Sequence, residues 1–207
     1  MLHERRETIP SIIKDHPEWH RGRRDYSLWL INASTGEICE KVGAAKEHLS
    51  AYLLKPYQRQ PHITVFVCGF LTDTPLFEDD YSPEQFRVQA QMLEEGKIKP
   101  FFLEIGGLSS FSSAPFLEVR DLEGGIERAR AALSISVSEI GGGTFTPHIT
   151  IGLYSGAYSS KIVAGRISTF KSRPVRLRVE RITFATYRAR EIAGALTHQF
   201  DVALGPK

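Results

Sequence analysis

The chain carries two copies of one short phrase, Pro61-His62-Ile63-Thr64-Val65 and Pro147-His148-Ile149-Thr150-Ile151. Each copy lies in a run of apolar and β-branched residues, which predicts a strand. On a strand, side chains at positions i and i+2 leave the same face, about 6.5–7 Å apart. Each copy therefore presents one imidazole and one hydroxyl on one face and turns its other side chains toward a core.

The two copies occupy equivalent places in a repeated order of elements. In the first unit, residues 26–31 predict a strand, a helix begins near residue 36 and stops at Pro56, and the motif strand follows over 62–71. In the second, residues 101–105 and 115–119 predict strands, and the motif strand covers 148–154. The helix between them is predicted from apolar residues at helical spacing and ends at the three glycines 141–143; its inward residues are Ile126, Ala129, Leu133, Val137 and Ile140.

The remaining segments complete an α+β pattern. Ser82, Pro83 and Gln85 form the start signal of a further helix, with a capping box. In the tail, we expect a helix over Ser159 to Ile167 and a last strand over Thr197 to Leu204. A long strand over Val175 to Tyr187 changes its apolar phase, which predicts a bulge near Glu180-Arg181.

The order of these elements predicts one bilobal domain over residues 26–207, preceded by an arm over residues 1–25 for which we expect no role. Two antiparallel-rich sheets with outer helices would surround a central cleft, related by a pseudo-twofold axis.

Composition places the chain among ordinary globular proteins. Its 207 residues are 42% hydrophobic and 24% charged, with a formal net charge of +2. No apolar run is long enough to span a membrane and the N-terminus lacks an apolar signal core, so we expect a cytoplasmic protein without a membrane partner. Cys39 and Cys68 are the only cysteines, which disfavours disulfides and thiolate zinc sites.

The repeated motif carries the equipment for acid–base chemistry on a phosphate ester. His62 and His148 would supply a base and an acid that titrate near neutrality, and sequence does not decide which is which. Thr64 and Thr150 would donate hydrogen bonds to phosphate oxygens. This chemistry requires neither a metal nor another cofactor. Phe66 and Tyr154 fall in phase with the motif histidines, so their rings are candidates for stacking on a base, with core packing as the alternative.

From residue 26 onward, these residues resemble the 2H phosphoesterase superfamily, in its bacterial RNA ligase/cyclic phosphodiesterase-like branch, whose hallmark is two His-x-Thr/Ser motifs. The resemblance implies a bilobal fold and a hydrolase that acts on a 2′,3′-cyclic phosphate of an RNA end or a related nucleotide. It also implies opening toward a 2′-phosphate and weak 2′-5′ RNA ligation. His62 and His148 would be the catalytic pair, and Thr64 and Thr150 would bind phosphate. The chain departs from many relatives in continuing Gly152-Leu153-Tyr154, where they carry a basic or polar residue.

Other functions remain open at this stage. The groove could belong to a non-catalytic module that binds RNA or a nucleotide. A metallohydrolase is disfavoured because no carboxylate accompanies either motif, and Pro17 interrupts the pair His16 and His20. The three glycines lack the lysine of a phosphate loop. Arginines from 173 to 190 predict a solvated face on which one or two could hold phosphates. The sequence does not indicate the oligomeric state.

Overall fold

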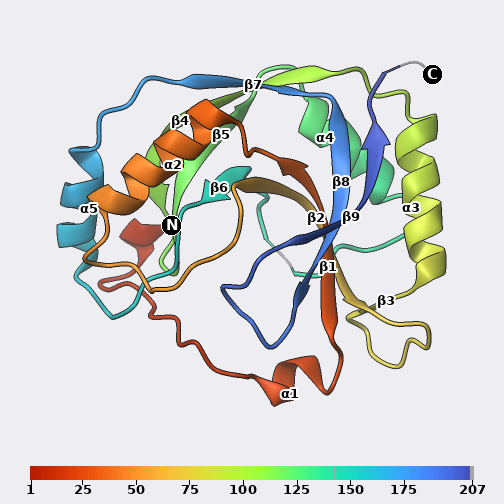
Figure 1. Cartoon of the computed structure of the whole chain (residues 1–207), viewed down its shortest axis with the longest axis horizontal. Helices are drawn as coiled ribbons and strands as arrows, with labels where there is room; N and C mark the ends of the chain where they lie inside the picture. The colour runs from red at the N-terminus through yellow and green to blue at the C-terminus, as the bar shows by residue number, and fades with distance from the viewer. Residues whose placement is uncertain (142, 206–207) are drawn as a thin grey trace.

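The structure, a computed structural model, consists of two sheets with helices on their outer sides (Figure 1). It describes residues 1–141 and 143–205, without the side chain of His3. One sheet has the strand order β3-β2-β1-β8-β9 and the other β6-β5-β4-β7. The strands are β1 (Asp25–Asn32), β2 (His62–Leu71), β3 (Asp80–Tyr81), β4 (Phe101–Ser110), β5 (Pro115–Asp121), β6 (His148–Thr150), β7 (Val175–Val179), β8 (Arg181–Arg188) and β9 (Thr197–Ala203).

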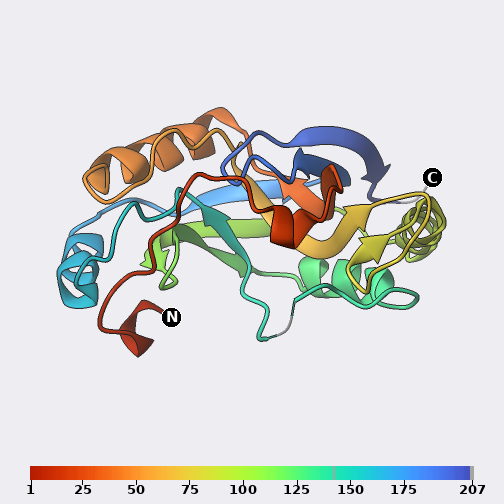
Figure 2. The same cartoon turned by 90° about the horizontal axis from the view of Figure 1, so that it is seen from below.

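All neighbouring strands are antiparallel except β2 and β3. The predicted α+β class with two antiparallel-rich sheets is therefore confirmed. The helices are η1 (Leu2–Glu4), α1 (Pro17–His20), α2 (Gly36–His48), α3 (Pro83–Glu95), α4 (Gly125–Leu133) and α5 (Ser160–Ser168). Figure 2 shows α2 on one side of the two sheets and α4 on the other. Helix α3 begins as expected, with the reciprocal capping box of Ser82 and Gln85.

One continuous core joins the two sheets. It contains Trp29 and Ile31 from β1, Leu103 from β4 and Leu117 from β5, and the helices cover it with side chains such as Ile38 of α2. All five of these side chains are at most 2% exposed. The two motif strands are thus anchored by their inward isoleucines, Ile63 and Ile149, in the same apolar cluster.

The change of phase predicted in the strand over 175–187 has a different cause from the one expected. β7 pairs with β4, whereas β8 pairs with β1 in the other sheet. Glu180 separates the two strands, so the chain crosses between the sheets there and the segment contains no bulge at Glu180-Arg181. A bulge within one strand and a crossing between two sheets produce the same change of phase in the sequence. In both cases the apolar side chains before and after the change face the shared core.

The helix before the second motif is shorter than its apolar spacing predicts. α4 ends at Leu133 with Ser134 as its C-cap, well before the glycines, of which Gly142 lies outside the described residues. Val137 is buried although it is not helical. The following segment runs along β2, where Ile140 donates its backbone N–H to the carbonyl of Val67 at 3.1 Å. The second motif strand is also shorter than the expected 148–154, since β6 ends at Thr150.

The N-terminal arm packs along the molecule instead of standing apart from it. Its backbone bonds to one lobe through Thr8 and Ser11, which donate to the carbonyls of Tyr158 and Tyr154 at 2.9 and 2.8 Å. Further along, Arg23 bonds to Asp79 and Asp80 beside β3. Among the described residues, no helix combines the length and apolar character needed to cross a bilayer.

Candidate active site

The two motif histidines are held in the same way. β2 and β6 touch although they belong to different sheets. Nδ1 of His62 lies 2.7 Å from the carbonyl oxygen of Gln60, and Nδ1 of His148 lies 2.7 Å from that of Thr146. A carbonyl oxygen can only accept, so Nδ1 carries the hydrogen in both rings. Within the described part of the chain, neither Nε2 has a hydrogen-bond partner, which leaves both Nε2 atoms for a ligand.

Burial keeps both imidazoles neutral. His62 is 9% exposed, and burial lowers its pKa to about 4, with smaller contributions from the charges of Arg59, His148 and His198. The same cause lowers the pKa of His148. Each ring can therefore accept a proton at Nε2 at neutral pH.

The two threonines stand two residues beyond the histidines, as the alternation of a strand requires. Thr64 and Thr150 are both half-buried. Neither hydroxyl is hydrogen-bonded to any residue that the structure describes, and neither is sealed from solvent. Two hydroxyl donors with no internal partner are therefore available on the same strand faces as the two imidazoles.

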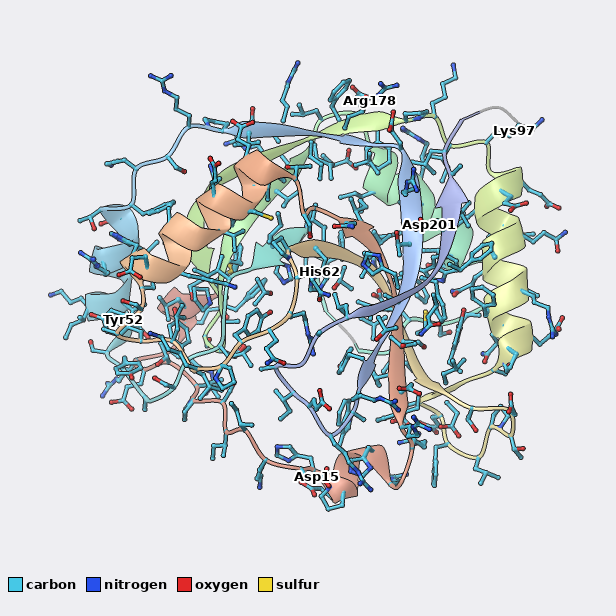
Figure 3. All side chains as sticks on the ribbon, viewed as in Figure 1. Asp15, Tyr52, His62, Lys97, Arg178 and Asp201 are labelled. Atoms are coloured by element: carbon cyan, nitrogen blue, oxygen red, sulfur yellow. The ribbon has the colours of Figure 1, made fainter. Side chains whose placement is uncertain are left out.

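A groove of about 260 Å³ runs between the motif strands. Thr64 and Val67 of β2 form one wall, and His148 of β6 forms the other. Its remaining lining comes from Phe111 in the β4–β5 turn, Arg130 of α4 and the described residues of the segment from Glu139 to Thr146. His62 lies deeper and does not line this groove, as its burial indicates, and Figure 3 places it near the middle of the molecule. The structure thus brings Thr64 of one motif and His148 of the other into one cavity.

These features agree with a match to a family model over residues 36–191, which is described as the 2′-5′ RNA ligase superfamily. The chain belongs to the 2′-5′ RNA ligase superfamily. A search of curated proteins finds no match.

Solved structures of similar fold include two of Escherichia coli LigT. The complex with 3′-AMP has a TM-score of 0.58 at 16% identity, covering 88% of this chain and 99% of that one. The complex with ATP has a TM-score of 0.56 at 16% identity, covering 89% and 100%. The protein TT0787 of Thermus thermophilus gives 0.55 at 15% identity, covering 88% and 100%. At this identity the likeness establishes a shared fold, so this member of the 2′-5′ RNA ligase superfamily has the bilobal fold of the 2H phosphoesterases.

Phe66 and Tyr154, expected as stacking rings, lie in the core instead of the groove of this superfamily member. Both are 0% exposed. Leu30 faces Thr64 and Trp29 faces Phe66, so Val65 is an extra residue in β2 and the strand bulges there. The bulge turns Phe66 onto the core face and puts Val67 in the groove.

Tyr154 lies beyond the end of β6, so its phase relative to His148 carries no information about its direction. Its hydroxyl is 2.6 Å from Oγ of Ser110, which satisfies it inside the second lobe. The polar end of this ring therefore has a partner within the protein, and its apolar body packs against Leu2 and Val163.

Phe111 and Phe145 line the groove, where Phe66 and Tyr154 were expected. Phe111 meets His148 edge-on, with ring centroids 4.9 Å apart. The guanidinium of Arg130 lies 3.8 Å from the ring centroid of Phe145. Phe145 stands three residues before His148, where Arg59 stands before His62. The repeat of the motif could have drawn attention to this pair of positions, whereas Phe111 sits in a Gly- and Ser-rich turn that gave no signal.

Potential metal ligands do not gather into a cluster in the described part of the chain. No group of three or more His, Cys, Asp and Glu side chains with the arrangement of a metal site occurs among these residues. His16 and His20, spaced as a helical metal pair would be, bond to different carboxylates, Glu18 at 3.0 Å and Asp15 at 2.7 Å. Each of these histidines therefore has a local structural partner.

Proposed function

We propose that this member of the 2′-5′ RNA ligase superfamily is a metal-independent phosphodiesterase that hydrolyses a 2′,3′-cyclic phosphate of an RNA end or a related nucleotide. The observation that carries the proposal is the paired geometry of the motifs. Two imidazoles on separate strands are fixed through Nδ1, both Nε2 atoms are left for a ligand, and each is followed by a hydroxyl with no described partner. Weak 2′-5′ RNA ligation would follow when the 5′-hydroxyl of another strand attacks phosphorus in place of water and the ribose 3′-oxygen leaves.

The reaction needs two proton transfers on opposite sides of phosphorus. Nε2 of one histidine takes a proton from water as the water oxygen bonds to phosphorus. Nε2–H of the other gives its proton to the ribose oxygen as the P–O bond breaks, leaving a phosphate monoester and a hydroxyl. A positioned acid or base contributes about 10²–10⁴-fold each. Thr64 and Thr150 donate hydrogen bonds to the non-bridging oxygens, where negative charge grows.

The lowered pKa values suit this scheme once substrate is bound. In the free protein, burial favours the neutral form of both rings. A cyclic phosphate anion between the Nε2 atoms favours the charged form and so raises both pKa values again. One ring can then hold the proton that it must donate while the other stays a base. Phe111 and Phe145 provide apolar faces in the same groove for the base of a nucleotide.

The test is turnover of the four 2′,3′-cyclic mononucleotides, in the presence of a chelator, by the intact protein and its His62→Ala and His148→Ala variants. His16→Ala is the matched control, because His16 is a histidine outside the groove. We expect turnover by the intact protein and the control, and a loss of at least 10²-fold in each motif variant. Activity that survives in both motif variants, or that the chelator abolishes, would refute the proposal.

The second candidate is a module that binds RNA or a nucleotide without turning it over. The same groove, with its two aromatic rings and the free hydroxyl of Thr64, would serve such a module. Equilibrium binding separates the two functions. A binding module would hold a cyclic nucleotide unchanged over hours and would keep its affinity when His62 and His148 are both replaced by alanine.

A further inference from the structure

Arginines from two distant parts of the sequence line a cavity outside the groove. A cavity of about 390 Å³ is lined by Gly22, Arg23 and Arg24, just before β1, and by Arg188, Arg190 and Glu191, at the end of β8. The two segments are held together by the pairing of β1 with β8 and by the backbone bond from Ala189 to Arg24 at 2.9 Å. The sheet therefore builds this concentration of guanidinium groups from two distant parts of the sequence.

Arg23 does not contribute free charge to this cavity. Its guanidinium bonds to Asp79 and Asp80, and its side chain is 10% exposed. It also lies 3.7 Å from the ring centroid of Phe70. Arg23 therefore acts as a buried anchor that ties the arm to the first lobe, and the charge available to a ligand comes from its neighbours.

The guanidinium groups of Arg24, Arg188 and Arg190 are available to bind a ligand in this cavity. Arg188 lies 3.4 Å from Asp25, and Arg190 lies 3.7 Å from Asp15, with exposed side chains at both arginines. Exposed pairs at such distances contribute little, so a better acceptor displaces them easily. The guanidinium of Arg24 donates to no residue in the ranges that the structure describes. We call Arg24, Arg188 and Arg190 the arginine cluster.

Arg59 lies between this cluster and the first motif histidine. It stands three residues before His62, and its charge acts on that imidazole. Its guanidinium lies 4.1 Å from the ring centroid of Tyr187, the residue next to Arg188. In Figure 3, His62 lies centrally and Asp15, the partner of Arg190, lies at the lower edge where β1 begins. Positive charge thus extends from the motif strand to the end of β8.

We propose that the arginine cluster binds backbone phosphates of an RNA strand whose terminal cyclic phosphate lies in the groove, so that an oligonucleotide is a better substrate than a mononucleotide. This inference rests on the proposed function. Guanidinium groups pair with phosphate oxygens through parallel hydrogen bonds, and such contacts position a strand without reading its bases. The substrate class is therefore RNA with a cyclic end, of any sequence at the positions beyond the groove.

The experiment compares 2′,3′-cyclic AMP with oligoribonucleotides of two, four, eight and twelve residues that end in the same cyclic phosphate. The test variant is Arg24→Ala, Arg188→Ala and Arg190→Ala combined. The matched control removes three exposed arginines of the other sheet, Arg120→Ala, Arg176→Ala and Arg178→Ala. We expect kcat/KM of the intact protein to rise with length and to fall with salt, and the test variant to lose this rise while it keeps its activity on the mononucleotide.

The salt dependence of kcat/KM gives the expected size of the effect of the three arginine substitutions. Three lost phosphate contacts on a single strand reduce the slope of log(kcat/KM) against log[salt] by about 2. A length effect that the control variant loses equally, or mononucleotide turnover without any length effect, would overturn the inference and leave the proposed function standing. Absence of turnover on every substrate would remove the proposed function and this inference with it. Competition by polyglutamate as strong as that by an RNA of equal charge would overturn the assignment to RNA.

Discussion

The imidazole of His62 combines deep burial with one short hydrogen bond. The carbonyl of Gln60 accepts from Nδ1, and the side chain of Gln60 in turn bonds to both backbone groups of Leu196, at 2.8 and 3.1 Å. The ring is therefore oriented by a backbone segment that is itself fixed to the loop before β9. The hydrogen bonds between Gln60 and Leu196 lie outside the His-x-Thr motif, and no local sequence pattern predicts them.

Burial of His62 makes stability depend on pH. Its folded pKa, about 4, is below the ordinary value of 6.5, so the unfolded chain binds the proton more readily between these values. Stability is therefore complete above pH 6.5 and falls as the pH drops toward 4. We expect the intact protein to lose roughly 2–3 kcal/mol more than His62→Gln between pH 7 and pH 4.5. Urea unfolding at both pH values measures this difference. Equal losses of unfolding free energy in the two proteins would show that His62 is not the group responsible for the pH dependence.

Thr64 tests the role of a hydroxyl without changing the shape of the strand. Thr64→Val removes the donor and keeps the branched side chain, whereas Thr64→Ser keeps the donor. We expect kcat to fall by about 10²-fold in the valine variant and by much less in the serine variant. Steady-state kinetics on a cyclic nucleotide distinguish the two. Equal kcat in both variants would mean that the hydroxyl does not touch the phosphate.

At the scale of elements, the edge of β2 explains why α4 stops early. β3 pairs only with the end of β2, at Phe70 and Leu71, so the earlier backbone groups of β2 need other partners. Arg130 donates to the carbonyl of Val65 at 2.5 Å, and Glu139 accepts from the amide of Val67 at 3.1 Å. The hydrogen bonds that satisfy this strand edge stabilise the protein more than one or two further turns of α4 would. The loop after α4 is in this way part of the first lobe and forms a wall of the groove.

Removing Glu139 should therefore loosen β2 beside the active groove. Glu139 also pairs with Arg130 at 2.7 Å, and both side chains are largely buried. We expect Glu139→Ala to reduce the free energy of unfolding by about 1–3 kcal/mol and to speed hydrogen exchange at the amide of Val67. Glu40→Ala, at an exposed position of α2, is the control and should change neither. Unchanged exchange at Val67 in the first variant would contradict this account of the β2 edge.

Local patterns were reliable where local physics decides the structure. The capping box at Ser82 and Gln85 predicted the start of α3 correctly, because its partners lie within one turn. The spacing of Val137 and Ile140 predicted a longer α4 and was wrong, because Val137 is buried without being helical and the backbone of Ile140 bonds to Val67 at the edge of β2. The phase of Phe66 failed for a related reason: the bulge at Val65 appears only when β2 is paired with β1. Long-range pairing is the information that a single sequence lacks.

The whole molecule behaves as a pair of sheets around one core. The predicted duplication anticipated two lobes. They share one apolar cluster, and the chain passes between their sheets from β3 through α3 to β4 and again from β7 to β8. The site forms only when the two sheets pack together, because His62 and His148 come from different sheets. The repeat indicated the two strands that come together at the groove, β2 and β6. Phe111 and the segment after α4, which complete the lining of the groove, carry no repeat.

A shared core predicts that the lobes unfold together. Leu117 lies in the four-stranded sheet, while both tryptophans report on the other sheet, Trp29 in β1 and Trp19 against Tyr26 and Phe70. We expect Leu117→Ala to cost about 2–5 kcal/mol and to shift the midpoints seen by tryptophan fluorescence and by circular dichroism equally. A fluorescence midpoint that stays in place while the circular dichroism midpoint falls would show that the lobes are separate folding units.

The central claim is that His62 and His148 act as one acid–base unit, and a double-mutant cycle tests it most directly. The measurement is kcat/KM on a 2′,3′-cyclic nucleotide for the intact protein, His62→Ala, His148→Ala and the double variant. Because both proton transfers are needed in one displacement, we predict that each single variant loses at least 10²-fold and that the double variant is little worse than the poorer single one. Single variants that keep most of the activity, or two losses that simply multiply, would contradict the account.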